Sequence, residues 1–134
     1  MHRMRALAVA LLLLLALAAT GCSGAAAAER VVITIAYSAF VPRQVTVPAG
    51  VPVTFVLVNE DPIDHEWIVG DEAVHAAHRT GTEATHGGRP TEVSVVALST
   101  VETTVTFPAA GRYPFICHLP GHEAYGMVGL VTVE

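Results

Sequence analysis

The chain has 134 residues, enough for one domain with a hydrophobic core, and 52% of them are hydrophobic. It has no lysine, and seven arginines stand against twelve acidic residues, which gives a formal net charge of −5 at pH 7. This charge argues against nucleic acid or an anionic lipid surface as a partner and favours an electropositive one.

Residues 1–21 have the features of a secretory signal peptide. A short basic start precedes an unbroken Ala/Leu/Val run that is too short for a comfortable membrane span. Residues 19–22, Ala-Thr-Gly-Cys, resemble the lipobox of bacterial lipoproteins, in which the cysteine becomes the lipidated first residue. We therefore expect a lipoprotein signal and a lipid anchor on Cys22, with plain cleavage near residues 25–28 as the alternative.

Export changes both the charge and the count of free thiols. Residues 22–30 are expected to form a short tether ahead of a folded domain over residues 31–134. The exported chain keeps five arginines and twelve acidic residues, a net charge of −7. If Cys22 is lipidated, Cys117 is a single thiol in an exported protein, and such a thiol usually binds metal or is a buried passenger. A disulfide between the two cysteines is disfavoured because it would join a flexible tether to a loop.

Short segments rich in β-branched residues, separated by turn residues, follow one another along the domain. The strands that we expect are 31–37, a short one within 40–50, 51–59, 65–69, 92–98, 102–107, 112–117 and 127–133. Residues 70–90 break the pattern, with two helical turns expected over 70–79 and a Gly/Thr-rich loop over 80–90. Seven or eight short strands in about 100 residues predict an all-β sandwich or barrel, largely antiparallel.

Four potential metal ligands lie at the ends of these strands or just beyond them. Cys117, His122 and Met127 fall within eleven residues, at the end of one strand and in the loop after it. His65, at the start of an upstream strand, is the best candidate for a second imidazole. A thiolate, two imidazoles and a weak thioether suit copper that cycles between Cu(I) and Cu(II), and this set is typical of blue-copper sites.

The order and spacing of these residues resemble the cupredoxin family of blue, type 1 copper proteins, such as plastocyanin and azurin. Cys117, His122 and Met127 are separated by four residues each, and a lone histidine, His65, precedes them. The resemblance covers nearly all of residues 31–134. It implies a cupredoxin-like Greek-key β-sandwich, antiparallel or mixed, of seven to eight strands with one inserted loop or short helix. It also makes the two histidines and the cysteine the equatorial ligands, and the methionine the axial ligand, of one copper ion per chain.

The sequence departs from the best-known family members at two places. Many of them have an asparagine after the first histidine, where this chain has Glu66, so we expect different hydrogen bonds around the ligands and a different reduction potential. The insertion at residues 70–90 carries His75, His78 and His86. It resembles the His/Met-bearing insertion of small exported bacterial cupredoxins linked with copper tolerance, but it contains no methionine.

The remaining histidines allow two interpretations. His75 and His78 are three residues apart and would share a helix face, so that together with His86 they could hold a second metal ion. A solvated, histidine-bearing loop is the favoured alternative. His118 is turned away from Cys117 by strand alternation, and we expect it to point outward or to support a ligand.

Acidic residues gather around the first ligand loop. They form either a solvated loop or a docking surface for a basic redox partner. These residues are Glu60, Asp61, Asp64, Glu66, Asp71 and Glu72. By the family resemblance, the exposed edge of His122, framed by residues 119–121, would be the port through which electrons pass.

The function expected from the sequence is that of a mononuclear type 1 copper protein. It would transfer single electrons outside the cytoplasmic membrane, as a monomer, to a redox partner with an electropositive surface. It would lie in the periplasm or another extracytoplasmic compartment and touch the membrane only through a lipid on Cys22. The rival is a copper chaperone or tolerance protein with extra histidine sites in residues 70–90. No enzyme is expected, since one thiolate and one domain are too few for the binuclear and multicopper enzymes.

Overall fold

The structure is a computed structural model of the chain, and it describes residues 29–81, 86 and 88–134. The expected signal peptide and Cys22 lie outside the described residues, as does most of the expected tether, 22–30. Within the described ranges, no helix is long and apolar enough to cross a membrane.

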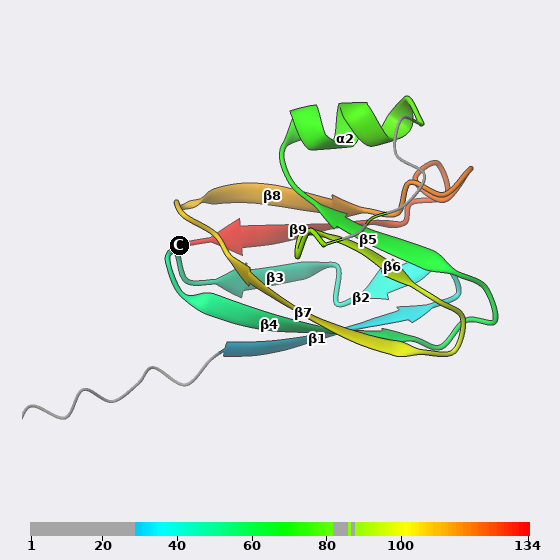
Figure 1. Ribbon diagram of the computed structural model, residues 1–134, viewed down its shortest axis with the longest axis horizontal. Helices are drawn as coiled ribbons and strands as arrows, with labels where there is room; N and C mark the ends of the chain where they lie inside the picture. Colours follow the sequence, from blue (N-terminus) through cyan, green and yellow to red (C-terminus); the bar gives the residue numbers. More distant parts are fainter. Residues whose placement is uncertain (1–28, 82–85, 87) are drawn as a thin grey trace, which may run out of the picture.

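Nine strands in the described residues form two sheets that pack face to face (Figure 1). The four-stranded sheet has the order β2-β1-β4-β7 and consists of β1 (Glu29–Ala36), β2 (Ala39–Val41), β4 (Pro52–Asn59) and β7 (Thr100–Thr106). The five-stranded sheet has the order β3-β9-β8-β5-β6 and consists of β3 (Gln44–Val47), β9 (Val128–Val133), β8 (Gly111–Ile116), β5 (His65–Val69) and β6 (Glu92–Val95).

Both sheets are mixed. Strand β1 runs parallel to β4 and β3 runs parallel to β9, whereas the other neighbours are antiparallel. The expected all-β sandwich of cupredoxin type, antiparallel or mixed, is therefore confirmed. The number of strands is nine rather than seven or eight, because the segment 39–47 forms two short strands, one in each sheet. Strand β1 begins at Glu29, two residues before the expected start of the domain.

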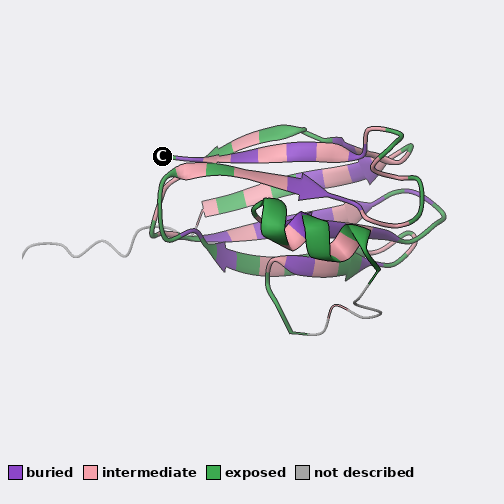
Figure 2. Ribbon diagram, turned by 90° about the horizontal axis from the view of Figure 1, so that it is seen from above, coloured by how far each residue is buried: buried purple, intermediate pink, exposed green. Residues whose placement is uncertain are grey.

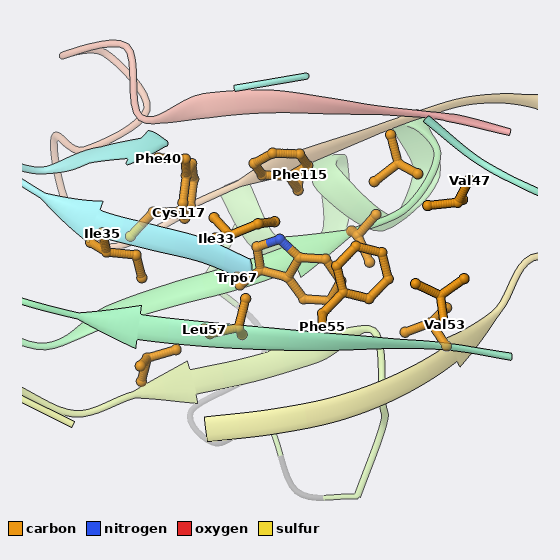
Figure 3. Close-up of a cluster of buried hydrophobic side chains, with 14 of the residues drawn as sticks. Ile33, Ile35, Phe40, Val47, Val53, Phe55, Leu57, Trp67, Phe115 and Cys117 are labelled. Carbon is orange, nitrogen blue, oxygen red and sulfur yellow. The ribbon is translucent and has the colours of Figure 1, made fainter. Parts of the chain in front are cut away.

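The core lies between the two sheets, and strand alternation fills it. In β4, Val53, Phe55 and Leu57 are fully buried on the face toward the other sheet. Strands β1 and β9 show a similar alternation of buried and less buried residues, and Figure 2 colours all strands by burial. Trp67 and Phe115 reach into this core from the five-stranded sheet (Figure 3). Fully burying side chains of this size contributes about 1.5–3 kcal/mol each.

The expected helical turns form the helix α2 (Glu72–Arg79), which lies over the outer face of the five-stranded sheet (Figures 1 and 2). Asp71 caps its first turn, because its side chain accepts a hydrogen bond from the backbone N–H of Val74 at 3.1 Å. At the other end, the Arg79 guanidinium donates to Glu123 in the loop between β8 and β9. The helix is thus attached to the loop that carries the expected ligands.

Candidate metal centre

The loop from Cys117 to Met127 joins β8 to β9 and closes on itself through backbone hydrogen bonds. The N–H of Cys117 donates to the carbonyl of Met127 at 3.2 Å, and the N–H of Met127 donates to that of His122 at 3.0 Å. Gly121 and Gly126 have φ values of +86° and +90°, a region where side chains are strained. Turns at these two glycines fold the loop back over the end of β8, so that its donor residues return to one place.

Three of the four predicted ligands converge at this end of the sandwich. Nδ1 of His122 lies 3.3 Å from Sγ of Cys117 and 3.3 Å from Nδ1 of His65. All three donor atoms lie within 4.8 Å of one another, although His65 is 52 positions upstream of the cysteine in the chain. The fourth residue, Met127, is fully buried in the same core cluster as Cys117. The structure therefore brings three of the four predicted donor atoms together and buries the fourth residue in the core cluster that contains Cys117.

The ring of His65 is held by a carboxylate on its far side. Its Nε2 donates a hydrogen bond to Oδ2 of Asp61 at 2.9 Å, which places the proton on Nε2 and leaves the lone pair of Nδ1 toward Cys117. Asp61 in turn accepts the backbone N–H groups of Tyr37 and Ser38, both at 2.7 Å. A carboxylate that fixes the tautomer of a histidine is the usual support of a metal-bound imidazole.

The sulfur of Cys117 is buried and receives a backbone donor. The N–H of Glu66 lies 3.3 Å from Sγ. Burial raises the pKa of the Cys117 thiol, although N–H groups of Glu66 and Leu119 act in the opposite direction. The main chain of Glu66 thus connects the two ligand segments, while its side chain turns to His86, with Oε1 3.0 Å from Nε2.

His122 is the more exposed of the two converging imidazoles. His65 is 1% exposed, whereas His122 is only partly buried. Burial, and then the neighbouring His65, lower the pKa of His122, which favours the neutral ring that can donate a lone pair. A shallow hollow includes Leu119, Pro120 and Gly121, the stretch expected to frame the exposed edge, but it is lined also by Arg79, His118, Glu123 and Ala124 and not by His122 itself.

The histidines of the insertion do not group as the sequence suggested. His75 is fully buried, with Nδ1 3.0 Å from Nε2 of His118 and Nε2 3.2 Å from the carbonyl of Pro114. His118 is turned away from Cys117, as expected, but toward the helix rather than into solvent. His78 and His86 instead gather with Glu92, which sequence reasoning missed.

The position of Glu92 near these histidines could have been predicted only from the pairing of β6 with β5. Glu92 pairs with Ile68 in the β5–β6 ladder, and its Oε2 lies 3.8 Å from Nε2 of His78 in α2. Asp61 was grouped with the acidic surface, but it is 9% exposed and bound to His65. The spacing of Asp61 and His65, four residues with a proline between them, is the one sequence signal for this contact.

The two-sheet sandwich and the donor set at one end define a cupredoxin-type protein. One cysteine sulfur and two imidazoles, with a methionine buried in the same core cluster, fit copper better than a hard cation such as Mg²⁺ or Ca²⁺, which prefers oxygen ligands. The family model described as the cupredoxin-like domain matches residues 6–133. The chain therefore belongs to the cupredoxin-like family.

Individual relatives agree with this assignment. The copper-resistant cuproprotein CopI of Pseudomonas aeruginosa is 34% identical over 142 residues, covering 82% of this chain and 78% of the relative. CopI of Rubrivivax gelatinosus is 37% identical over 99 residues, covering 71% of this chain and 59% of the relative. Among solved structures, auracyanin A, a blue copper protein of the bacterium Chloroflexus aurantiacus, is similar with a TM-score of 0.65 and 30% identity, over 81% of this chain and 100% of that one.

Proposed function

We propose that the protein is a mononuclear type 1 copper protein that transfers single electrons outside the cytoplasmic membrane. The observation that carries the proposal is the convergence of Nδ1 of His65, Sγ of Cys117 and Nδ1 of His122 beside the buried Met127. Copper bound by these residues would supply a one-electron couple between Cu(II) and Cu(I). We assign no catalytic reaction to the chain.

The residues around the donors would keep their geometry constant while the charge of the site changes. His65 is fixed by Asp61, and the sulfur of Cys117 accepts the N–H of Glu66. Both donors belong to rigid strands or to a loop closed by its own backbone. A site that changes shape little between two charge states has little reorganisation to overcome, and this favours fast electron transfer. The thiol of Cys117 would give up its proton on becoming a ligand.

The partly exposed His122 would be the place where electrons enter and leave. A redox partner with an electropositive docking surface suits the acidic chain. Asp61 and Asp64 accept backbone hydrogen bonds within the domain. Glu72 is exposed but is paired with Arg79, so the exposed Glu60 would be the acidic residue most open to such a partner.

Export and a lipid on Cys22 complete the proposal. The basic start and apolar run of residues 1–21 support secretion, and residues 19–22 support lipidation. We propose a periplasmic or other extracytoplasmic location on this basis.

Copper tolerance is the second candidate function, because two of the relatives are copper-resistant cuproproteins. In that case the chain would bind or sequester copper, with the histidines of residues 70–90 adding capacity. One copper ion per chain with fast electron self-exchange would favour the electron carrier. Two or more ions per chain, with slow exchange, would favour tolerance.

The test of the first site is the optical and electron-spin spectrum of residues 29–134 after addition of Cu(II). We expect an intense visible thiolate-to-copper band that is absent from Cys117→Ser. His75→Gln is the matched control, since this buried histidine lies outside the donor set and the band should persist. A protein that binds Cu(II) without the band contradicts the proposal.

A further inference from the structure

A second group of donors lies on the outer face of the five-stranded sheet, beneath and beside α2. His78 comes from the last turn of the helix, His86 from the segment after it, and Glu92 from the start of β6. Oε2 of Glu92 lies 3.8 Å from Nε2 of His78 and 3.7 Å from Nδ1 of His86. The three donor atoms all lie within 4.8 Å of one another, so they face a common point.

These side chains are almost completely withdrawn from solvent. The exposed fractions are 4% for His78, 4% for His86 and 5% for Glu92. Among the described residues, Nε2 of His78 and Oε2 of Glu92 are buried without a hydrogen-bond partner. Buried polar atoms are nearly always partnered, so two such atoms facing each other call for an explanation.

Each imidazole ring of the cluster uses the nitrogen that faces away from Glu92 for a hydrogen bond to another part of the protein. Nδ1 of His78 lies 2.8 Å from the carbonyl of Val74, which accepts its proton and leaves Nε2 with a lone pair. Nε2 of His86 lies 3.0 Å from Oε1 of Glu66, which in the same way leaves the lone pair of Nδ1 toward the cluster. The separations to Glu92 are too long for hydrogen bonds.

The third donor is an anion. The Arg89 guanidinium donates to Oε1 of Glu92 at 2.9 Å and so favours the ionised carboxylate. Two imidazole nitrogens and a carboxylate oxygen therefore lie close together at one buried point. A cation at their common point satisfies all three.

We propose that His78, His86 and Glu92 form a second metal site that binds a borderline divalent transition-metal ion, Zn²⁺ or Cu²⁺. Two imidazoles and one carboxylate suit these ions, and three protein donors leave one position for water. Around a tetrahedral ion with bonds of about 2.1 Å, the donors would be roughly 3.4 Å apart. The ring nitrogens of His78 and His86 need to move toward Oε2 of Glu92 by only a few tenths of an ångström to reach this separation.

Each donor also has the outer partner that metal ligands usually have. The carbonyl of Val74 supports His78, the carboxylate of Glu66 supports His86, and the guanidinium of Arg89 supports Glu92. His118 stacks on His78 with ring centroids 5.5 Å apart and closes one side of the cluster. The site shares no donor with His65, Cys117 and His122, so its occupancy can be measured separately from that of the first site.

The experiment counts Zn²⁺ bound to the metal-free protein in equilibrium dialysis at buffered free Zn²⁺. We expect two ions per chain in the wild type, and one in His78→Ala. In Glu92→Gln, which keeps the shape of the side chain, we expect the affinity of one site to fall at least tenfold. Glu60→Gln, an exposed carboxylate outside both clusters, is the matched control and should bind two ions.

A second readout separates this proposal from the first one. Each variant is also titrated with Cu(II), and the visible band from Cys117 reports on folding and on the first site. Loss of one Zn²⁺ with the band intact supports the second site. A wild type that binds one Zn²⁺ only, or a Glu92→Gln variant with two ions at unchanged affinity, overturns it and leaves a buried ion-pair network instead. If His78→Ala fails to fold, Glu92→Gln decides alone.

Discussion

The imidazole of His65 and the carboxylate of Asp61, four residues apart, form a hydrogen bond of 2.9 Å on the side of the ring that faces away from Cys117. This contact ties the first donor to the turn between β1 and β2, because the same carboxylate accepts the N–H groups of Tyr37 and Ser38. The orientation of a ligand on one sheet thus depends on a loop of the other sheet.

The first prediction is that Asp61→Asn raises the reduction potential of the copper-loaded protein. The carboxylate makes the imidazole of His65 a stronger donor and stabilises the more highly charged Cu(II). If the loss weakens Cu(II) binding about tenfold more than Cu(I) binding, the potential rises by about 60 mV. Voltammetry measures the shift. Asp64→Asn is the control, since Asp64 accepts the N–H of Ala97; equal shifts in both variants would refute the role of Asp61.

The second prediction concerns the stability of the metal-free protein in acid. Burial alone would raise the pKa of Asp61, but the N–H groups of Ser38 and Tyr37, followed by His65, lower it overall. A carboxyl group with a lowered pKa in the folded state contributes stability above its unfolded pKa of about 3.9, and this contribution is lost as the pH falls through the folded value.

The free energy of unfolding of the wild type should therefore fall more steeply below about pH 4 than that of Asp61→Asn. Urea unfolding at several pH values measures both curves. Parallel curves would show that Asp61 titrates alike in the folded and unfolded chains.

The third prediction is that Met127→Leu keeps the visible band and raises the potential. Leucine has a similar volume and no thioether, so the fully buried position should lose less than about 1.5 kcal/mol. Loss of a weak donor disfavours Cu(II) more than Cu(I), and the axial ligand is known to tune such sites. Optical spectra and voltammetry test it. An unchanged potential would mean that Met127 is only a core residue.

The fourth prediction is that Gly129→Ala strongly destabilises the domain. A Cβ at this position in β9 would overlap the ring of Phe115 and lie 2.8 Å from the carbonyl oxygen of Arg43. Crowding of this kind costs about 1–3 kcal/mol, and here a backbone atom blocks relaxation. Gly50→Ala is the comparison: it meets no atom within 4 Å but has a φ of +71°, and should cost about 1 kcal/mol. Chemical denaturation ranks the two, and a smaller loss at Gly129 would contradict the packing.

The sequence alone determined the fold class and the identity of the donors gathered at the first site. Strand patterns of period two are local features of the sequence, and so is the spacing of Cys117, His122 and Met127 in one loop. Both can therefore be recognised without knowledge of the fold. His65 was found because it stands at the start of a strand. The division of residues 39–47 into two strands in different sheets was not readable, since it depends on which partners each short strand finds.

Only the tertiary structure decided what surrounds these donors. Asp61 reached His65 through a loop, and Glu92 met His78 and His86 because β6 pairs with β5 under the helix α2. His75, which the sequence grouped with His78, turned instead to His118. Contacts between side chains on different elements depend on strand register and on which segment covers the sheet. Neither can be predicted from a local sequence pattern.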